Sequence, residues 1–327
     1  MKMEGDAGVD RPDGIEAGEG ASRDARRQRA RKGFWRIADP KITLASVAGL
    51  ALGTCLAADA GPLSVPWLAI TVLGIFAFEA AKNASGEIFD FDSGADRGVE
   101  AKDRSPFSGG KRVLVDGLLT RRQVGRIAAA FYGVGILSGL VIVVFREPAV
   151  LWFGLVGAGL AFAYHARPIA LSYRGWGELA VGIAYGPLIT VGTYLVQRGD
   201  TPFHVLAASL PLGLLVASFL WINEFPDAEA DAAAGKRTWV VRLGKRRASR
   251  AFALLVAVAF FATAIQPLLG FDRGLWLGLA GLPAGLAAAR RLGADPHDTA
   301  RTVPAQAWTL ASFLLYAFGA GAGVLLL

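Results

Sequence analysis

Nine long apolar segments dominate this sequence, most of them close to the length that crosses a bilayer. A spanning α-helix needs about 20 predominantly apolar residues, and lipid favours helices because their backbone groups are hydrogen-bonded internally. The chain is 54% hydrophobic, which is too apolar for a soluble globular domain. We therefore predict an all-α integral membrane protein with nine transmembrane helices in a bundle. The segments are Ile42–Ala58, Pro66–Ala81, Val124–Phe145, Ala149–Tyr164, Gly177–Val196, Val205–Ile222, Ala251–Leu269, Leu275–Ala289 and Ala307–Leu327.

Basic residues are distributed unevenly between the alternate connections of these segments. If the N-terminus is cytoplasmic, only Arg146, Arg198 and Arg273 of the 34 Lys and Arg residues lie on the far side. Because Lys and Arg accumulate in cytoplasmic loops, we expect a plasma (inner) membrane protein with a cytoplasmic N-terminus. Both acidic clusters of the chain then fall on the cytoplasmic side, which predicts one cytoplasm-facing site.

The more regular acidic cluster ends the sixth apolar segment. Asn223, Asp227 and Asp231 are spaced four residues apart, so on a helix they lie within an arc of about 80°. Carboxylates at the mouth of a membrane helix are costly to desolvate, and a divalent cation offsets that cost. Hard carboxylate oxygens suit Mg²⁺, which commonly bridges to phosphate, and the basic pair Lys236 and Arg237 follows. The pattern predicts a metal–diphosphate site.

A second acidic cluster follows the second apolar segment. Asn83, Glu87 and Asp90 are spaced four and three residues apart and so share a helix face. A basic pair follows here as well, Lys111 and Arg112. Two acidic clusters at corresponding helix ends, each followed by a basic pair, suggest one site assembled from two halves.

The N-terminal region differs in composition from the rest of the chain. Residues 1–33 are rich in Gly, Asp and Glu and lack an apolar core, which predicts a disordered cytoplasmic tail ahead of one domain at 34–327. The basic run Arg26–Lys32 is typical of a membrane anchor, and we favour this over a nucleic-acid partner. With one cysteine and three scattered histidines, the sequence predicts neither a disulfide nor a histidine metal site.

These motifs resemble the UbiA superfamily of intramembrane aromatic prenyltransferases, which carry two Asp-rich motifs on cytoplasmic helix ends of a nine-helix bundle. The spacing Asn223-x-x-x-Asp227-x-x-x-Asp231 matches the second motif in full. Four further stretches are similar to the menaquinone branch, the 1,4-dihydroxy-2-naphthoate polyprenyltransferases: Gly109–Thr120, Tyr164–Glu178, Gly186-Pro187 with Gly192–Tyr194, and Ala234–Gly244. The resemblance extends from about Trp35 to the C-terminus.

The sequence departs from the family at two positions. The first motif is usually Asn-Asp-x-x-Asp, but this chain has Gly86-Glu87-x-x-Asp90, with Asn83 one turn earlier as a substitute for the amide. Asp39-Pro40 stands where the family often has Arg-Pro. Because the departures lie in the first motif and near the N-terminus, they leave the reaction class in place and the acceptor open.

The resemblance implies Mg²⁺-dependent transfer of a polyprenyl group from a prenyl diphosphate donor to an aromatic acceptor at the lipid bilayer. The implied acceptor is 1,4-dihydroxy-2-naphthoate, in menaquinone biosynthesis. The implied metal ligands are Glu87, Asp90, Asp96, Asp227 and Asp231, and the implied catalytic residues are Asp90, Asp227, Asp231 and Tyr164. The implied diphosphate-binding residues are Lys111, Arg112, Lys236 and Arg237. The implied substrate-binding residues are Asn83, Asn223, Arg167, Tyr173 and Tyr194.

Three alternatives remain open at this point. A prenyltransferase of the same superfamily would keep the chemistry and use a homogentisate-, carotenoid- or tetrapyrrole-like acceptor. A transporter predicts charges at mid-helix, whereas most charges here cluster at helix ends. A non-catalytic membrane scaffold is suggested by Gly86 and Glu87. Mg²⁺-dependent release of pyrophosphate from a prenyl diphosphate separates both enzymes from the other two.

Overall fold

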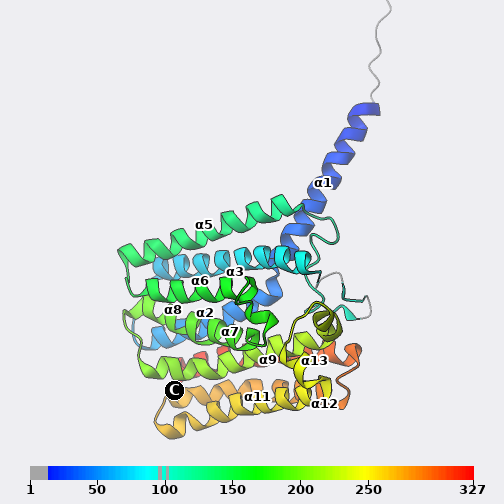
Figure 1. Ribbon diagram of the computed structural model, residues 1–327. Coiled ribbons are helices and arrows are strands. Elements are labelled where there is room, and N and C mark those ends of the chain that lie inside the picture. Colours follow the sequence, from blue (N-terminus) through cyan, green and yellow to red (C-terminus); the bar gives the residue numbers. More distant parts are fainter. Residues whose placement is uncertain (1–13, 95–97, 101–102) are drawn as a thin grey trace, which may run out of the picture.

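The fold is a bundle of α-helices with the connections gathered at its two ends (Figure 1). A computed structural model describes residues 14–94, 98–100 and 103–327, and within these ranges it contains no strand. The helices are α1 (Gly14–Ala38), α2 (Pro40–Asp59), α3 (Val65–Ser93), α5 (Arg121–Phe145), α6 (Val150–His165), η2 (Leu171–Tyr173), α7 (Gly177–Ile183), η3 (Ala184–Leu188), α8 (Ile189–Arg198), α9 (Phe203–Ala233), α10 (Trp239–Leu243), α11 (Lys245–Ile265), η4 (Pro267–Leu269), η5 (Arg273–Gly281), α12 (Leu282–Ala294) and α13 (Thr299–Leu326).

Each of the nine apolar segments coincides with helical structure, but fewer than nine helices have spanning length. Within the described residues six are long and apolar enough to cross a membrane, and α2 becomes a seventh if it is counted with α1, from which it is bent by 47°. The fourth segment forms the 16-residue α6. The eighth is divided between the 3₁₀ helix η5 and α12. The prediction of an all-α membrane protein is confirmed. The prediction of nine spanning helices is not confirmed.

The N-terminal region contains the helix α1. Residues 14–33, which we assign to a disordered tail, belong to α1, and residues 1–13 lie outside the described part of the chain. The second half of α1 is rich in Arg, which has high helix propensity and needs no core to form a helix. The helix ends before Pro40, because a residue preceding proline disfavours the α conformation. On the N-terminal side of this point, α1 projects away from the bundle (Figure 1).

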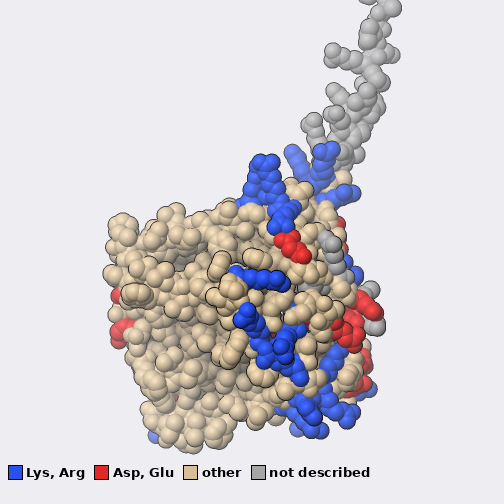
Figure 2. All heavy atoms as spheres, in the orientation of Figure 1, with Lys and Arg blue, Asp and Glu red and all other residues tan. Residues whose placement is uncertain are grey.

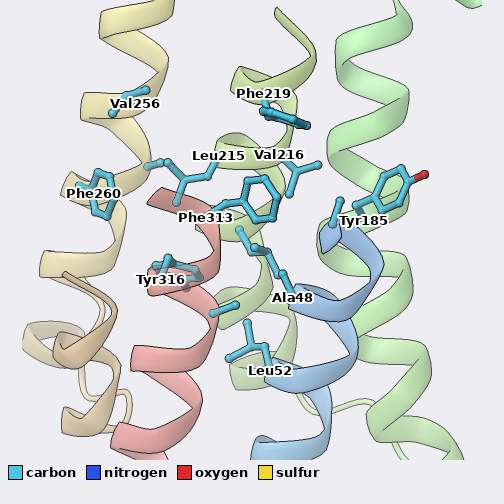
Figure 3. Packing of buried hydrophobic residues seen from close by; sticks show 14 of the residues in the cluster. Ala48, Leu52, Tyr185, Leu215, Val216, Phe219, Val256, Phe260, Phe313 and Tyr316 are labelled. Carbon is cyan, nitrogen blue, oxygen red and sulfur yellow. The ribbon is translucent and has the colours of Figure 1, made fainter. Parts of the chain in front are cut away.

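The core of the bundle is an aromatic cluster where α9 and α13 meet (Figure 3). Phe219 of α9 and Phe313 of α13 pack edge to face at 5.6 Å between ring centroids. One turn further along α13, the Tyr316 hydroxyl donates a hydrogen bond of 2.6 Å to the Ala208 carbonyl of α9. Lipid is as apolar as these side chains, so close packing and interhelical hydrogen bonds supply the stability. The cluster fixes α9, the helix that carries the second acidic motif.

Glycines let the helices around α9 approach to backbone contact. A Cβ at Gly186 would lie 2.5 Å from the Cα of Gly213, so only glycine fits this crossing of η3 and α9. Pro187 lies beside it in the π-helical turn η3. Small residues in membrane helices permit close packing of this kind. The crossing also holds α7 and α8 against α9.

Charged side chains gather at the end of the bundle nearest α1, and the face shown in Figure 2 is almost uncharged toward the other end. At the end of the bundle that has few charged side chains, two arginines donate hydrogen bonds to backbone carbonyls of neighbouring segments. The Arg146 guanidinium donates to the carbonyls of Val196 and Gln197 at 2.9 and 2.7 Å. The Arg198 guanidinium donates to the Gly61 carbonyl at 2.5 Å. The uneven charge distribution read from the sequence is therefore a real difference between the two ends.

Candidate active site

Lys236 joins the two acidic motifs. Its ammonium Nζ lies 3.6 Å from Asp90 Oδ1 of α3 and 3.2 Å from Asp231 Oδ1 of α9, although these helices are far apart in the sequence. Burial alone would lower the pKa of Lys236, but Asp90 and Asp231 outweigh it and hold the pKa well above its ordinary value. Lys236 therefore brings together one carboxylate from each acidic cluster.

The second motif lies on the last turns of α9. Because the helix continues through Ala233, it keeps Asn223, Asp227 and Asp231 on one face. Asp227 Oδ2 accepts a hydrogen bond of 3.0 Å from the backbone N–H of Gly109, in the long loop between α3 and α5. The Asp227 Oδ1 and Asn223 Oδ1 atoms are buried without a hydrogen-bond partner. Such buried orphan acceptors indicate space for a ligand that supplies positive charge or donors.

The first motif lies on the last turns of α3. Glu87 Oε1 accepts a hydrogen bond of 2.7 Å from the Leu114 N–H, so the α3–α5 loop reaches both motifs. The Glu87 Oε2 and Asn83 Nδ2 atoms are buried and have no hydrogen-bond partner. Asp96, a predicted metal ligand, lies outside the described residues.

The residues of the two motifs fit a Mg²⁺–diphosphate complex better than a bare metal ion. Within the described ranges no group of three or more His, Cys, Asp or Glu side chains is close enough to hold an ion. Mg²⁺ retains several waters and commonly uses one or two carboxylates plus substrate phosphates, so a three-carboxylate cluster is not required. The unpartnered oxygens of Asp227 and Glu87 are available for such bonds, and Asp90 and Asp231 already hold one cation.

The first basic pair lies beside the motifs and is engaged with acidic side chains. Lys111 Nζ is 3.6 Å from Asp39 Oδ2, and Arg112 Nε is 3.5 Å from Asp116 Oδ1. Lys111 is thus paired with an acidic residue that lies between α1 and α2.

Three further predicted residues line a basic pocket at the end of the bundle. Arg167, Tyr173 and Arg237 surround a hollow of about 730 Å³, with Arg174 and Arg242. The Arg237 N–H donates to the Tyr173 carbonyl at 2.9 Å, and the Tyr173 ring lies 5.4 Å from Lys236 Nζ. The pocket is therefore separated from the acidic motifs by one tyrosine ring, and the side chain of Arg237 is exposed.

Tyr164 and Tyr194 occupy opposite ends of the bundle. Tyr164 ends α6 near the motifs and lines an apolar cavity. Tyr194 of α8 contacts His204 at a ring distance of 6.3 Å. His204 begins α9, and Asp227 lies 23 residues later, about 34 Å along an ideal helix. The structure does not bring Tyr194 to the motifs, because α8 runs away from them.

Sequence reasoning missed a polar cluster just below the motifs. Lys82, Glu79, Ser46 and Tyr185 line the same apolar cavity as Tyr164. Glu79 and Lys82 are three residues apart at the end of an apolar segment, and ionisable residues in membrane helices are rare and functional. That signal was available, but the acidic motif immediately after it is stronger.

His165 leaves no room for a side chain at position 86, where the chain has glycine. A Cβ at Gly86 would lie 2.9 Å from His165 Nε2, and the His165 ring is stacked on Phe89 at 5.8 Å. Gly86→Asn, which restores the family's amide, should therefore destabilise the protein by about 1–3 kcal/mol through overpacking. Thermal unfolding in detergent measures this change.

The control for this substitution is removal of the ring. In the Gly86→Asn/His165→Ala double variant, asparagine should cost less stability than it does when His165 is present. Additive costs of the two substitutions would show that His165 is not the obstacle.

Comparisons with known proteins agree with this geometry. The model of the UbiA prenyltransferase family matches residues 46–314. The 1,4-dihydroxy-2-naphthoate octaprenyltransferase of Bacillus subtilis is 25% identical over 227 residues, 69% of this chain and 71% of that protein. The 2-carboxy-1,4-naphthoquinone phytyltransferase of Synechocystis is 30% identical over 198 residues, 60% of this chain and 61% of that protein. The match thus spans less than two thirds of the second relative.

Solved structures show the same fold. The apo structure of a UbiA homolog from Aeropyrum pernix has a TM-score of 0.67 at 20% identity, covering 87% of this chain and 98% of that one. A UbiA homolog from Archaeoglobus fulgidus, bound to DMAPP and Mg²⁺, has a TM-score of 0.66 at 16% identity and covers 90% and 99%. At these identities the structures establish the fold alone.

Proposed function

Because the chain belongs to the UbiA prenyltransferase family, we propose that it transfers a polyprenyl group from a prenyl diphosphate to 1,4-dihydroxy-2-naphthoate, with Mg²⁺ as cofactor. The observation that carries the proposal is the convergence of Asp90, Asp231 and Lys236. Carboxylates from two helices and a half-buried ammonium suit a metal-bound diphosphate, which needs both kinds of contact.

The carboxylates and Lys236 would have different roles when the diphosphate leaves the donor. Glu87, Asp90, Asp227 and Asp231 would hold Mg²⁺, which neutralises the leaving diphosphate when it is bound. Lys236 adds a fixed positive charge that needs no rearrangement during the reaction. The donor's C–O bond breaks to give an allylic cation and pyrophosphate.

The acceptor then attacks the allylic cation. Tyr164 lies between the motifs and the apolar cavity, and an aromatic face stabilises a nearby cation. An electron-rich ring carbon forms the new C–C bond, and a naphthoate acceptor loses its carboxylate as CO₂. The naphthoate acceptor rests on what the relatives from Bacillus subtilis and Synechocystis are named for.

We place the reaction at the cytoplasmic face of the plasma membrane, with the N-terminus in the cytoplasm. The motifs lie at the charge-rich end of the bundle, which the distribution of Lys and Arg assigns to the cytoplasm. A site at this end can accept a prenyl diphosphate whose tail lies in the bilayer and whose diphosphate lies in water.

The test is a transfer assay in membranes containing the full chain, Mg²⁺, a radiolabelled prenyl diphosphate and 1,4-dihydroxy-2-naphthoate. We expect labelled demethylmenaquinol with Mg²⁺, which air oxidises to demethylmenaquinone during extraction, and complete loss of product with excess EDTA, because the carboxylates then lack the cation that neutralises the diphosphate. Chromatography of the extracted lipid measures both results.

The assay also separates the alternatives. Pyrophosphate release without a prenylated naphthalene product would keep the prenyltransferase and reject this acceptor. Absence of both products from folded protein would reject the enzyme and support a transporter or a scaffold.

A further inference from the structure

The basic pocket beside Tyr173 is a separate feature from the acidic motifs, and it lies at the charge-rich end of the bundle (Figure 2). It has a volume of about 730 Å³ and is formed by two loops, one that follows α6 and one that follows α9. Among the described residues that line it none is acidic. Four are arginines with exposed side chains: Arg167, Arg174, Arg237 and Arg242. The pocket is therefore strongly positive and suits an anion.

The protein does not neutralise these arginines. Within the described ranges none of the four forms an ion pair with a carboxylate. The neighbouring Lys236, by contrast, is paired with Asp90 and Asp231. A guanidinium presents a fork of N–H donors that matches the oxygens of a phosphate. Several such groups around one hollow, without carboxylates to balance them, therefore favour a phosphate ligand.

Hydrogen bonds between the two loops fix the shape of the pocket. The Arg242 guanidinium donates to the carbonyls of Arg237 and Arg174 at 2.8 and 2.5 Å. The Arg237 N–H donates to the Tyr173 carbonyl at 2.9 Å. Gly175 has a φ of +72°, and a Cβ there would lie 2.9 Å from the Arg237 carbonyl oxygen, so this close approach of the loops requires glycine. The backbone that carries the arginines is thus held in place before a ligand binds.

Exposed apolar side chains accompany the pocket. Trp176, which lines it, is 55% exposed, and Ile169 in the same loop is 46% exposed. In the helices on either side of that loop, Phe162 near the end of α6 is 68% exposed and Leu179 at the start of α7 is 54% exposed. Such side chains face lipid in a membrane helix, and tryptophan is enriched at the level of the headgroups. A phosphate with acyl chains would use both the charge and the apolar surface, whereas a soluble phosphate would use only the charge.

We propose that this pocket binds the headgroup of an anionic phospholipid from the surrounding bilayer. The lipid phosphate pairs with Arg167 and Arg174, which share the loop of Trp176, and the acyl chains lie against the exposed apolar side chains of α6 and α7. Basic pockets at the ends of membrane helices bind lipid headgroups in this way. The proposal does not depend on the proposed function, because the Tyr173 ring lies between the pocket and Lys236.

The test compares two lipids that differ in the net charge of the headgroup. Purified full-length protein in detergent is titrated with dioleoyl phosphatidylglycerol and with dioleoyl phosphatidylcholine, and native mass spectrometry measures the bound lipid. We expect the wild type to bind phosphatidylglycerol at least about tenfold more tightly, because each basic residue near an anionic headgroup contributes about fivefold. In the Arg167→Gln/Arg174→Gln double variant the preference should fall to within about threefold, with phosphatidylcholine binding unchanged.

Arg246→Gln/Arg250→Gln is the matched control, because it removes the same charge from exposed positions of α11 that do not line the pocket. It should keep the wild-type preference to within about twofold. Equal loss in the two double variants would assign the preference to general surface charge and overturn the proposal. So would equal binding of the two lipids by the wild type. Binding of glycerol phosphate as tightly as phosphatidylglycerol would assign the pocket to a soluble phosphate and reject the lipid.

Discussion

Asp227→Asn is expected to slow Mg²⁺-dependent release of pyrophosphate from a prenyl diphosphate by about a hundredfold or more. The substitution removes one negative charge from the second motif while preserving the size of the side chain, and its amide oxygen can still accept from the Gly109 N–H. One preorganised electrostatic contact to a developing charge is worth about 10²–10³ in rate. Colorimetric detection of phosphate after pyrophosphatase treatment measures the loss.

Glu229→Gln is the matched control for this substitution. Glu229 is exposed on the same turns of α9, two residues beyond Asp227, and makes no ion pair with a described residue. We expect its rate to stay within about twofold of the wild type, as surface substitutions usually do. Equal losses in both variants would mean that charge on α9 matters generally and that Asp227 has no particular role.

Helix spacing was sufficient to predict most of the acidic site. Residues four apart share a helix face, so the sequence placed Asn223, Asp227 and Asp231 together without any structure. Alternation of the apolar segments then brought Asp90 to the same end of the bundle. That Lys236 lies between the two motifs depends on how the chain turns after Ala233, which spacing alone does not specify.

Other residues show where sequence reasoning stops. Tyr194 resembles a family position, but the direction of α8 carries it toward His204 at the opposite end. Lys82 and Glu79 are separated by one helical turn, and only the packing of α6 and η3 reveals that Lys82 faces two tyrosine rings. Segment length overestimated the spanning helices, because the eighth apolar run is split by a 3₁₀ turn at its glycines.

Lys236→Met is expected to change two properties of the protein in opposite directions. It removes the ammonium that the diphosphate needs, so kcat/KM for the prenyl donor should fall at least about tenfold, the scale of a charge-assisted hydrogen bond. It also leaves Asp90 and Asp231 without their cation. Mg²⁺ should therefore bind the donor-free variant more tightly than it binds the wild type, and calorimetric titration measures this.

Arg237→Met tests whether the effect belongs to Lys236 or to the basic pair as a whole. The Arg237 side chain is exposed and lines the outer pocket, with the Tyr173 ring between that pocket and the carboxylates. Its removal should lower kcat/KM far less than Lys236→Met and leave Mg²⁺ affinity unchanged. If both variants lose activity equally and neither binds Mg²⁺ more tightly, Lys236 is one of several interchangeable surface charges. The opposite shifts in Lys236→Met alone would show that this ammonium competes with Mg²⁺ for the two aspartates until the diphosphate arrives.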